Sequence, residues 1–443
     1  MRTPVRGSFE AVREGVSGIV IDAYKHLPKR GWADVWPSPV FFSAKRVPDV
    51  SQETLESLHG EYGDHVRLKA KGHNILLVSH PQAVRDIFTR MPVEKTVDRG
   101  ITKKIGSYFN PNVLTSPDPV AKEFHDFYVH RINKGADSFR AQAREIAGRY
   151  LDRLEPGAID LQPVFRRIAF HVTLTMLFDV DDIDLDHNQA DIGAMEAFYG
   201  VVESVQEGYV SRDPALDGAV ARLRAQIEER IEAWKIAPSE DDPHLTINQI
   251  MILQNAGFET TAAALSWMTH YAAPQPSLQN GEPAFVLAMM KEALRLHPVV
   301  HVVSRTALEP FSTHRHEYAA GDVILCNIAV AHRHPEFWAD PDRFDPGRDF
   351  NTGAFMPFAL GPRACVGPMQ TRVVVQEVFA ALFERFRLAP WPGRPVHPVE
   401  SFAVKPSACP VVLERRGAEN VPLAAIRERD EAEAARDDDQ RVR

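Results

Sequence analysis

The chain has only three cysteines, Cys326, Cys365 and Cys409, among its 443 residues. A set this small and odd in number argues against a disulfide framework and a cysteine-rich metal cluster, and it indicates a reducing compartment. The first 14 residues lack the apolar core of a signal peptide. No apolar run approaches the roughly 20 residues that span a bilayer. These absences predict a soluble, cytoplasmic protein.

The chain also lacks blocks of positive charge and internal repeats. Its formal net charge is −9, and the segment 417–443, with eight acidic and five basic residues, contributes −3 of it. The remaining acidic excess is spread along the chain, which favours solubility. Nucleic acid and anionic membranes are therefore poor candidate partners.

The residues that are present form an ordinary globular composition, 44% hydrophobic and 25% charged. Apolar residues recur mostly at helical spacing, with short strand-like runs towards both ends. Helices are predicted at 51–62, near 81–89, and at 122–134, 138–154, 162–178, 192–209, 214–234, 245–271, 284–297 and 368–385. Strands are predicted at 65–68, 74–79, 299–303 and 323–328, near 404, and at 410–413. We expect an N-terminal segment that wraps the body (1–50), one catalytic domain (51–416) and a charged tail, disordered or a frayed helix (417–443).

Cys365 lies in the segment 358–367, FALGPRACVG, immediately before a predicted helix. Glycines let a backbone approach a flat ligand closely, and a helix N-terminus stabilises a thiolate. Arg363 adds a cation that can pair with a carboxylate of the same ligand. For a lone cysteine, a buried structural thiol in a glycine-rich turn is the common alternative.

This segment resembles the haem-binding signature of the cytochrome P-450 family, Phe-x-x-Gly-x-Arg-x-Cys-x-Gly, at every fixed position. The resemblance extends over roughly residues 50 to 415. It implies that Cys365 ligates the iron of heme b, with Phe358 and Gly367 beside the cofactor. It also implies the fold: mainly α with a minor β region, the triangular cytochrome P-450 fold. In that fold the haem lies between the long oxygen-activation helix and the cysteine-bearing helix.

Two further segments resemble motifs of the same family that support the haem-binding loop. Glu292 and Arg295, spaced i, i+3, share one helix face and can pair. The segment 341–344, PDRF, resembles the motif whose arginine, here Arg343, completes a Glu–Arg–Arg triad. The implied role is structural, a buried charge network that fixes the loop against the core. Taken singly, Glu-x-x-Arg is a common surface pair.

The segment 256–261, AGFETT, lies inside the long apolar helix and resembles the family's oxygen-activation motif. A glutamate buried in an apolar helix is costly unless it has a purpose. A threonine can bond the preceding turn's carbonyl and loosen the helix. The resemblance assigns proton delivery to Glu259 and Thr260. The alternative is that Thr260 only bonds its own helix.

The resemblance also places residues around the cofactor and the substrate. The haem propionates are assigned to Arg131, Arg305 and Arg363, with a weaker contribution from His125. Phe127 stands where relatives often have tryptophan, so a ring hydrogen bond is lost. The residues predicted to line the substrate pocket are Ile252, Asn255, Ala256, Val300, His301 and Phe402. Polar Asn255 and His301 favour a substrate with hydrogen-bonding groups, although a contact to a neighbouring helix explains Asn255 equally well.

The function that the resemblance implies is haem-thiolate monooxygenation. The enzyme would activate O2 and hydroxylate, desaturate, couple or oxidatively decarboxylate a mid-sized substrate of natural-product, for example peptide, biosynthesis. Electrons would come from a ferredoxin and its NAD(P)H-dependent reductase, because no flavin domain is fused. A peroxide-driven peroxygenase is the nearest alternative, and the Glu259–Thr260 pair argues against it. A non-catalytic haem sensor has no use for that pair, and a hydrolase with Cys365 as nucleophile lacks an evident histidine partner.

The sequence differs from the family pattern in two stretches that are expected to lie far from the iron. The stretch 272–283 is short and broken by three prolines, and 234–245 is compressed. These differences concern the outer shell and the surface for a redox partner rather than the chemistry.

Overall fold

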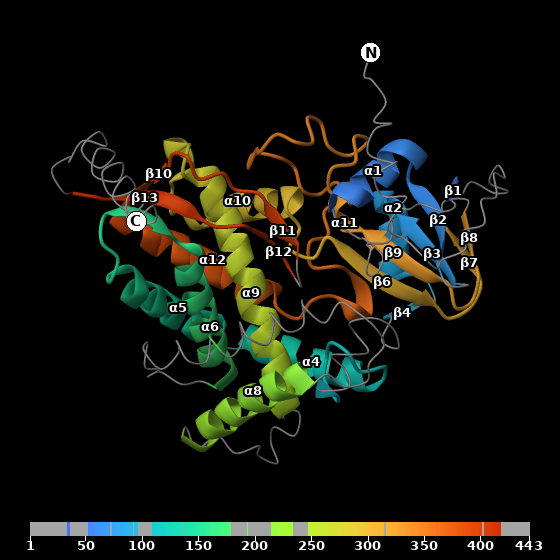
Figure 1. The fold of residues 1–443 in the computed structure, drawn as a ribbon, viewed down its shortest axis with the longest axis horizontal. Coiled ribbons are helices and arrows are strands. Elements are labelled where there is room, and N and C mark those ends of the chain that lie inside the picture. Colours follow the sequence, from blue (N-terminus) through green and yellow to red (C-terminus); the bar gives the residue numbers. More distant parts are fainter. Residues whose placement is uncertain are drawn as a thin grey trace, which may run out of the picture.

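The computed structural model describes residues 33–35, 52–70, 73–91, 93–95, 109–134, 136–178, 193, 214–233, 247–313, 316–400 and 403–417. Within these ranges helices predominate and the strands form a smaller part (Figure 1). The fold class predicted from the sequence is therefore confirmed. The wrapping segment, the helix predicted at 192–209 and the charged tail lie outside the described residues, apart from 33–35, 193 and 417.

The described helices are α1 (Gln52–Tyr62), α2 (Pro81–Thr89), α4 (Val120–Lys134), α5 (Ala136–Leu151), α6 (Gln162–Phe178), α8 (Pro214–Ala233), α9 (Ile247–Ala272), α10 (Pro283–Leu296), α11 (Ile328–Ala331) and α12 (Pro368–Arg385), with 3-10 turns η2 (Pro276–Leu278) and η3 (Gly361–Arg363). The strands are β1 (Ala33–Val35), β2 (His65–Ala70), β3 (His73–Val78), β4 (Val93–Lys95), β5 (Gly157–Asp160), β6 (Val302–Ala307), β7 (Phe311–Thr313), β8 (His316–Tyr318), β9 (Val323–Asn327), β10 (Phe386–Pro390), β11 (Pro398–Glu400), β12 (Val404–Pro406) and β13 (Pro410–Arg415).

The strands form one large sheet and three small ones. The large sheet has the order β1-β2-β3-β9-β6-β4, in which β1/β2 and β3/β9 are parallel and the other pairs antiparallel. The β2–β3 hairpin pairs Val66 with Leu77, and both side chains are buried. β10, β13 and β5 form a second sheet, while β11 pairs with β12 and β7 with β8. The strands therefore join the beginning of the chain to its last third.

Helix α9 runs through the middle of the molecule (Figure 1). It packs against α6, α8, α10, α12 and β12. Its 26 residues contain one acidic residue, Glu259, and no lysine or arginine. A helix that is apolar on nearly all sides is stable only when it is enclosed, which explains its central place. The long helix predicted at 245–271 is thus confirmed, with bounds Ile247–Ala272.

The proline-broken stretch between α9 and α10 passes close to α12. Gly281 makes this possible, because a Cβ at this position would lie 3.0 Å from Cα of Ala380 in α12. Leu278 of η2 is buried in the main core. The shortened connection therefore packs on α12, the helix that follows Cys365.

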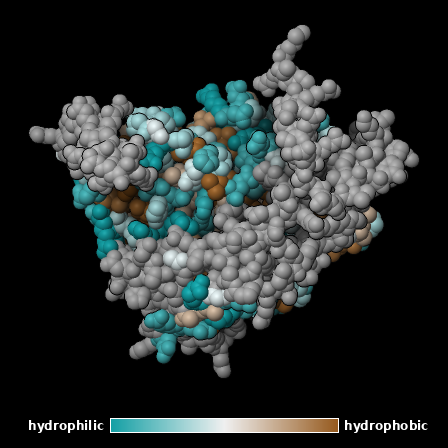
Figure 2. All heavy atoms as spheres, viewed as in Figure 1, coloured by the Kyte–Doolittle hydropathy of each residue, from teal (hydrophilic) through white to brown (hydrophobic). Residues whose placement is uncertain are grey.

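The described surface is ordinary for a globular protein. In the part visible in Figure 2 it is mainly hydrophilic, with small apolar areas between. The large hydrophobic side chains exposed among the described residues are Val120, Val300 and Leu308. None of the described helices combines the length and the hydropathy needed to cross a membrane.

Candidate active site

The loop before α12 brings Cys365 to the helix N-terminus by a sequence of tight turns. Ala359 (φ 54°) and Gly361 (φ 75°) both adopt the left-handed region. A Cβ on Gly361 would lie 2.0 Å from the carbonyl oxygen of Phe88 at the end of α2, so only glycine fits this contact. The N–H of Cys365 donates to the carbonyl of Phe358 at 2.9 Å. The signature residues thus hold the loop against α2.

Cys365 differs from the other two cysteines in exposure. Its side chain is exposed, whereas Cys326 and Cys409 are buried. Burial raises the pKa of Cys326 to about 12 and raises the pKa of Cys409 as well. Sγ of Cys365 accepts the N–H of Gly367, the N-cap of α12, at 3.3 Å. A donor N–H and a helix N-terminus both favour a thiolate, so Cys365 is the cysteine placed for metal ligation.

Two arginines from distant segments lie near this loop. Arg305 of β6 is 3% exposed and stacks over the ring of Phe88 at 4.8 Å. Arg363 donates from Nη2 to the carbonyl of Ser116 at 3.0 Å and lies 3.4 Å from Asp118. Burial lowers the pKa of Arg305, and the charge of Arg363 lowers it further. Because the two guanidinium groups are close enough for one charge to lower the pKa of the other, a ligand with anionic groups between them would be favoured.

Helix α9 presents one open face near the cysteine. Among residues 250–269, only Ala256, Gly257 and Thr260 are partly exposed, and the spacing i, i+1, i+4 puts them on one side. A Cβ on Gly257 would lie 3.4 Å from Nε2 of Gln370, one turn into α12. The open face of α9 and the thiol of Cys365 therefore flank the same region. An exposed thiol, two buried guanidinium groups and an open helix face fit a haem.

Glu259 is buried between two cations. Its carboxylate accepts from Nε of Arg166 in α6 at 2.7 Å and from Nζ of Lys405 in β12 at 2.7 Å, while the side chain is 3% exposed. Thr260 Oγ1 donates to the carbonyl of Ala256 at 2.6 Å. The alternative considered from the sequence, that Thr260 bonds its own helix, describes this contact. Proton delivery by Glu259 and Thr260 stays a prediction.

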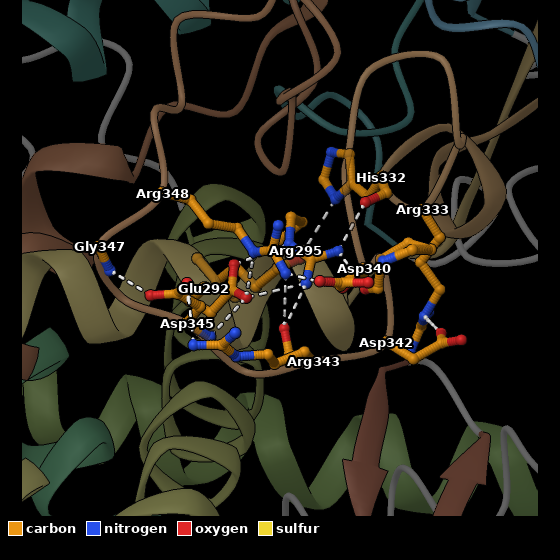
Figure 3. Close-up of polar contacts among 12 residues, drawn as sticks. Glu292, Arg295, His332, Arg333, Asp340, Asp342, Arg343, Asp345, Gly347 and Arg348 are labelled. Carbon is orange, nitrogen blue, oxygen red and sulfur yellow. Dashed lines mark hydrogen bonds and ion pairs between the residues drawn. The ribbon is translucent and has the colours of Figure 1, made fainter.

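The charge network around Glu292 contains the predicted pair and a different third member (Figure 3). Nε and Nη2 of Arg295 donate to the two carboxylate oxygens of Glu292 at 2.7 and 2.8 Å, and both side chains are fully buried. Nε of Arg348 donates to Oε1 of Glu292 at 3.0 Å, as does the N–H of Asp345 at 2.8 Å. These bonds offset the cost of burying the charges. The network fixes the loop 341–348 on α10.

The assignment of Arg343 to this triad was wrong. Its side chain is 68% exposed and lies 3.6 Å from Asp345. Only its carbonyl joins the network, accepting from Arg295 at 3.2 Å and from Arg348 at 3.0 Å. The sequence contains a second Pro-x-Arg at 346–348, five residues on, which is the signal that was missed.

The remaining predicted residues fall into four groups. His125 lies beside the loop, with Nε2 3.2 Å from the carbonyl of Ala364. Ile252 and Asn255 are buried, and Nδ2 of Asn255 donates to the carbonyl of Met251 in its own helix at 2.6 Å. His301 is buried 3.8 Å from Glu400, and Val300 is exposed. Phe402 and the side chain of Arg131 lie outside the described residues.

A second group of potential metal ligands, Asp64, His80 and His334, lies away from the haem region, with ligand atoms within 4.8 Å of one another. In His80 and His334 the Nδ1 atom accepts a backbone N–H, at 3.2 and 3.3 Å. Each neutral ring therefore carries its proton on Nε2, the atom that would have to bind the metal. Nε2 of His334 donates to Asp64 at 3.2 Å. These three residues therefore form a hydrogen-bonded cluster rather than a metal centre.

The fold and the site define a haem-thiolate protein, and comparison with known proteins identifies the family. The cytochrome P450 family model matches residues 35–208 and 284–410. The chain therefore belongs to the cytochrome P450 family and is a monooxygenase of that family.

Among curated relatives, cyclooctatin synthase of Streptomyces melanosporofaciens is 23% identical over 398 residues, which cover 76% of this chain and 85% of that protein. Human cytochrome P450 4F11 is 31% identical over 204 residues, 38% of this chain and 39% of that protein.

Solved structures show the same fold at low identity. A retinoic acid-bound cyanobacterial cytochrome, CYP120A1, has a TM-score of 0.71 at 18% identity and covers 83% of this chain and 95% of its own. CYP175A1 of Thermus thermophillus has a TM-score of 0.69 at 19% identity and covers 82% and 94%. These likenesses establish the fold alone.

Proposed function

We propose that this cytochrome P450 uses O2 to hydroxylate, desaturate, couple or oxidatively decarboxylate a mid-sized intermediate of natural-product biosynthesis. The observation that carries the proposal is the thiol of Cys365, exposed at the N-terminus of α12 while the other cysteines are buried. The cofactor is heme b, with Cys365 as the iron ligand. When a thiolate-held haem is bound, the chemistry it supplies is O–O bond cleavage.

The residues of the chain position that cofactor. Arg305 and Arg363 bind the propionates, and the Arg131 side chain and His125 are further candidates. Gly361 keeps the cysteine loop close to α2, and the N–H of Gly367 at the start of α12 donates to Sγ of Cys365. The network of Glu292, Arg295 and Arg348 fixes the loop 341–348, which precedes the cysteine loop in the chain, on α10.

Glu259 and Thr260 supply protons to the open face of α9. The two cations hold the carboxylate of Glu259 turned towards Arg166 and Lys405. To take up a proton, the carboxylate must release one of them. Lys405 is the better candidate, because its side chain is 21% exposed and can exchange its contact for water. Thr260 then passes the proton by turning its hydroxyl away from the carbonyl of Ala256.

The substrate carries hydrogen-bonding groups. His301, predicted to line the pocket, lies 3.8 Å from Glu400, so two polar side chains meet at this position. Cyclooctatin synthase is by its name a biosynthetic enzyme. A natural-product intermediate, with peptide-like compounds as candidates, agrees with both. Spin-shift titration should show binding of such compounds; tight binding of simple fatty acids alone contradicts the substrate class.

Electrons come from a ferredoxin and its NAD(P)H-dependent reductase. Substrate oxidation should then require both proteins and O2. Turnover of the same substrate at a comparable rate with hydrogen peroxide alone would instead support the peroxygenase alternative.

The first experiment is the carbon monoxide spectrum of the reduced protein. The wild type should show the red-shifted Soret band of a thiolate-ligated carbonyl, and Cys365→Ala should lose it. Cys409→Ala, a matched change at a buried cysteine, should retain the band. An unshifted band in the wild type, or a band that survives Cys365→Ala, contradicts the proposal.

A further inference from the structure

An aromatic cluster joins the C-terminal half of α9 to the end of α10. The rings of Trp267 and His297 stack with centroids 3.6 Å apart and an interplanar angle of 4°. The hydroxyl of Tyr271 lies 2.8 Å from Nε2 of His297. Two readily oxidised side chains therefore contact one imidazole.

The cluster continues the open face of α9. Positions 260, 264, 267 and 271 follow the spacing i, i+4, i+7, i+11, which places Thr260, Ala264, Trp267 and Tyr271 on one stripe. At 1.5 Å per residue, Trp267 lies about 10 Å and Tyr271 about 16 Å along the helix from Thr260. Tyr271 is partly exposed. The stripe thus leads from the proposed oxygen site towards solvent.

The direction of the Tyr271–His297 hydrogen bond follows from acidity. Burial, and then the charges of Arg333, His270 and Arg295, hold the pKa of His297 well below its usual value, so the ring is neutral. Burial raises the pKa of Tyr271 to about 12, so the phenol is intact. A phenol is a stronger acid than a neutral imidazole, so the O–H donates and Nε2 accepts. An oxidised phenol is a very strong acid, and even this weak base takes its proton.

We propose that Trp267, His297 and Tyr271 form a redox relay that carries single oxidising equivalents from the oxygen face of α9 to Tyr271. The proposal rests on the proposed function, because its oxidant is the one-electron oxidant left at the active site when dioxygen or peroxide is activated without substrate. Such a relay protects the site during unproductive turnover.

The relay is a sequence of one-electron steps. Trp267 gives one electron to the oxidant. Tyr271 then gives one electron to Trp267 and its hydroxyl proton to Nε2 of His297, which leaves a neutral tyrosyl radical beside an imidazolium. A small one-electron reductant, such as a thiol or ascorbate, returns the electron to Tyr271, and His297 returns the proton.

The test is flash photolysis of the full-length, haem-loaded protein with ruthenium(III) tris-bipyridine generated in solution. This oxidant does not depend on haem chemistry. In the wild type an indole radical should decay into a tyrosyl radical, seen by transient absorption and freeze-quench electron paramagnetic resonance. Tyr271→Phe should lose that conversion. His297→Phe, which keeps a ring on Trp267 but removes the proton acceptor, should lose it too.

Tyr150→Phe is the matched control, because Tyr150 is a buried tyrosine beside His171, with ring centroids 5.9 Å apart. It should leave the conversion unchanged. In a second assay, hydrogen peroxide without substrate should bleach the haem faster in Tyr271→Phe than in the wild type or Tyr150→Phe.

If conversion persists in Tyr271→Phe, or Tyr150→Phe lowers it equally, the relay is wrong and the cluster is only core packing. Absence of the thiolate-carbonyl band in the wild type would defeat the proposed function instead. The flash experiment would still report on the Trp267–Tyr271 pair.

Discussion

Glu259 shows how one buried charge is made tolerable at the centre of an apolar helix. A lone carboxylate there would be protonated or would destabilise the fold. Arg166 and Lys405 reach it from α6 and β12, so the ion pairs also tie these two elements to α9. The same contacts that stabilise the carboxylate oppose its movement towards Thr260. Stability and proton delivery therefore compete at this residue.

Glu259→Gln should lower the free energy of unfolding by about 1–3 kcal/mol, because two partly buried cations lose their counter-charge. Lys405→Met should lower the free energy of unfolding by less than Glu259→Gln does. The side chain of Lys405 is 21% exposed, so water already screens its ion pair with Glu259. Urea unfolding at pH 7 measures both. An equal or larger cost for Lys405→Met would show that Arg166 alone does not hold the carboxylate.

Arg348 and Arg343 provide a matched pair five positions apart. Arg348→Lys loses the guanidinium that bonds Glu292 and the carbonyls of Ala339, Asp340 and Arg343, and should cost about 1–3 kcal/mol. Arg343→Lys changes an exposed side chain and should stay within about 0.5 kcal/mol. Urea unfolding and retention of haem measure the difference. The reverse order would restore Arg343 to the triad.

At the scale of elements, the cysteine loop is defined by its contact with α2. Gly361→Ala should be strongly destabilising, because a left-handed residue costs about 1–2 kcal/mol and the added Cβ meets the carbonyl of Phe88 at 2.0 Å. Gly353→Ala is the control: its φ of +78° is similar, but no heavy atom lies within 4 Å. Urea unfolding gives the loss of unfolding free energy for each variant. The amount by which Gly361→Ala exceeds Gly353→Ala measures the clash with the carbonyl of Phe88. Equal costs would mean that the loop shifts freely.

The elements themselves could largely be predicted. Helical spacing located α6, α9, α10 and α12 to within a few residues, because each has a long apolar face. The signature around Cys365 located the loop that carries the exposed cysteine. The partners of the buried charges could not be predicted, because Arg166 and Lys405 reach Glu259 from 93 and 146 residues away. The third member of the triad could not be predicted either, because two neighbouring Pro-x-Arg segments, 341–343 and 346–348, fit the motif equally well. Only the packing in the structure shows that Arg348, and not Arg343, contacts Glu292.

At the scale of the whole molecule, several histidines are kept neutral by the fold. Burial is the largest cause that lowers the pKa of His59, His270, His297 and His332. In each case the unfolded chain binds a proton at a higher pH than the folded one. The unfolded state therefore gains protons first as the pH falls below about 6.5, and stability must decrease. Acid sensitivity in this range is a property of the whole fold.

His332 should carry a large part of that sensitivity. Its Nδ1 lies 3.3 Å from the carbonyl of Leu294 in α10, and its Nε2 accepts the N–H of Met356, ahead of the cysteine loop, at 2.9 Å. Both nitrogens are satisfied only in the neutral ring, and the pKa is lowered to about 3. Between pH 7 and 5 this one residue should lower the free energy of unfolding by about 2 kcal/mol.

Urea unfolding at pH 7, 6 and 5 compares the wild type with His332→Gln. The variant should be less stable at pH 7, because glutamine does not reproduce both ring hydrogen bonds. Its stability should nevertheless fall less between pH 7 and pH 5, since the unfolded chain has lost one group that gains a proton. Haem retention should follow the same order, because Met356 precedes the loop that carries Cys365. Parallel pH profiles for the two proteins would show that His332 has the same pKa in the folded and unfolded states, and the acid sensitivity would then belong to the other buried histidines.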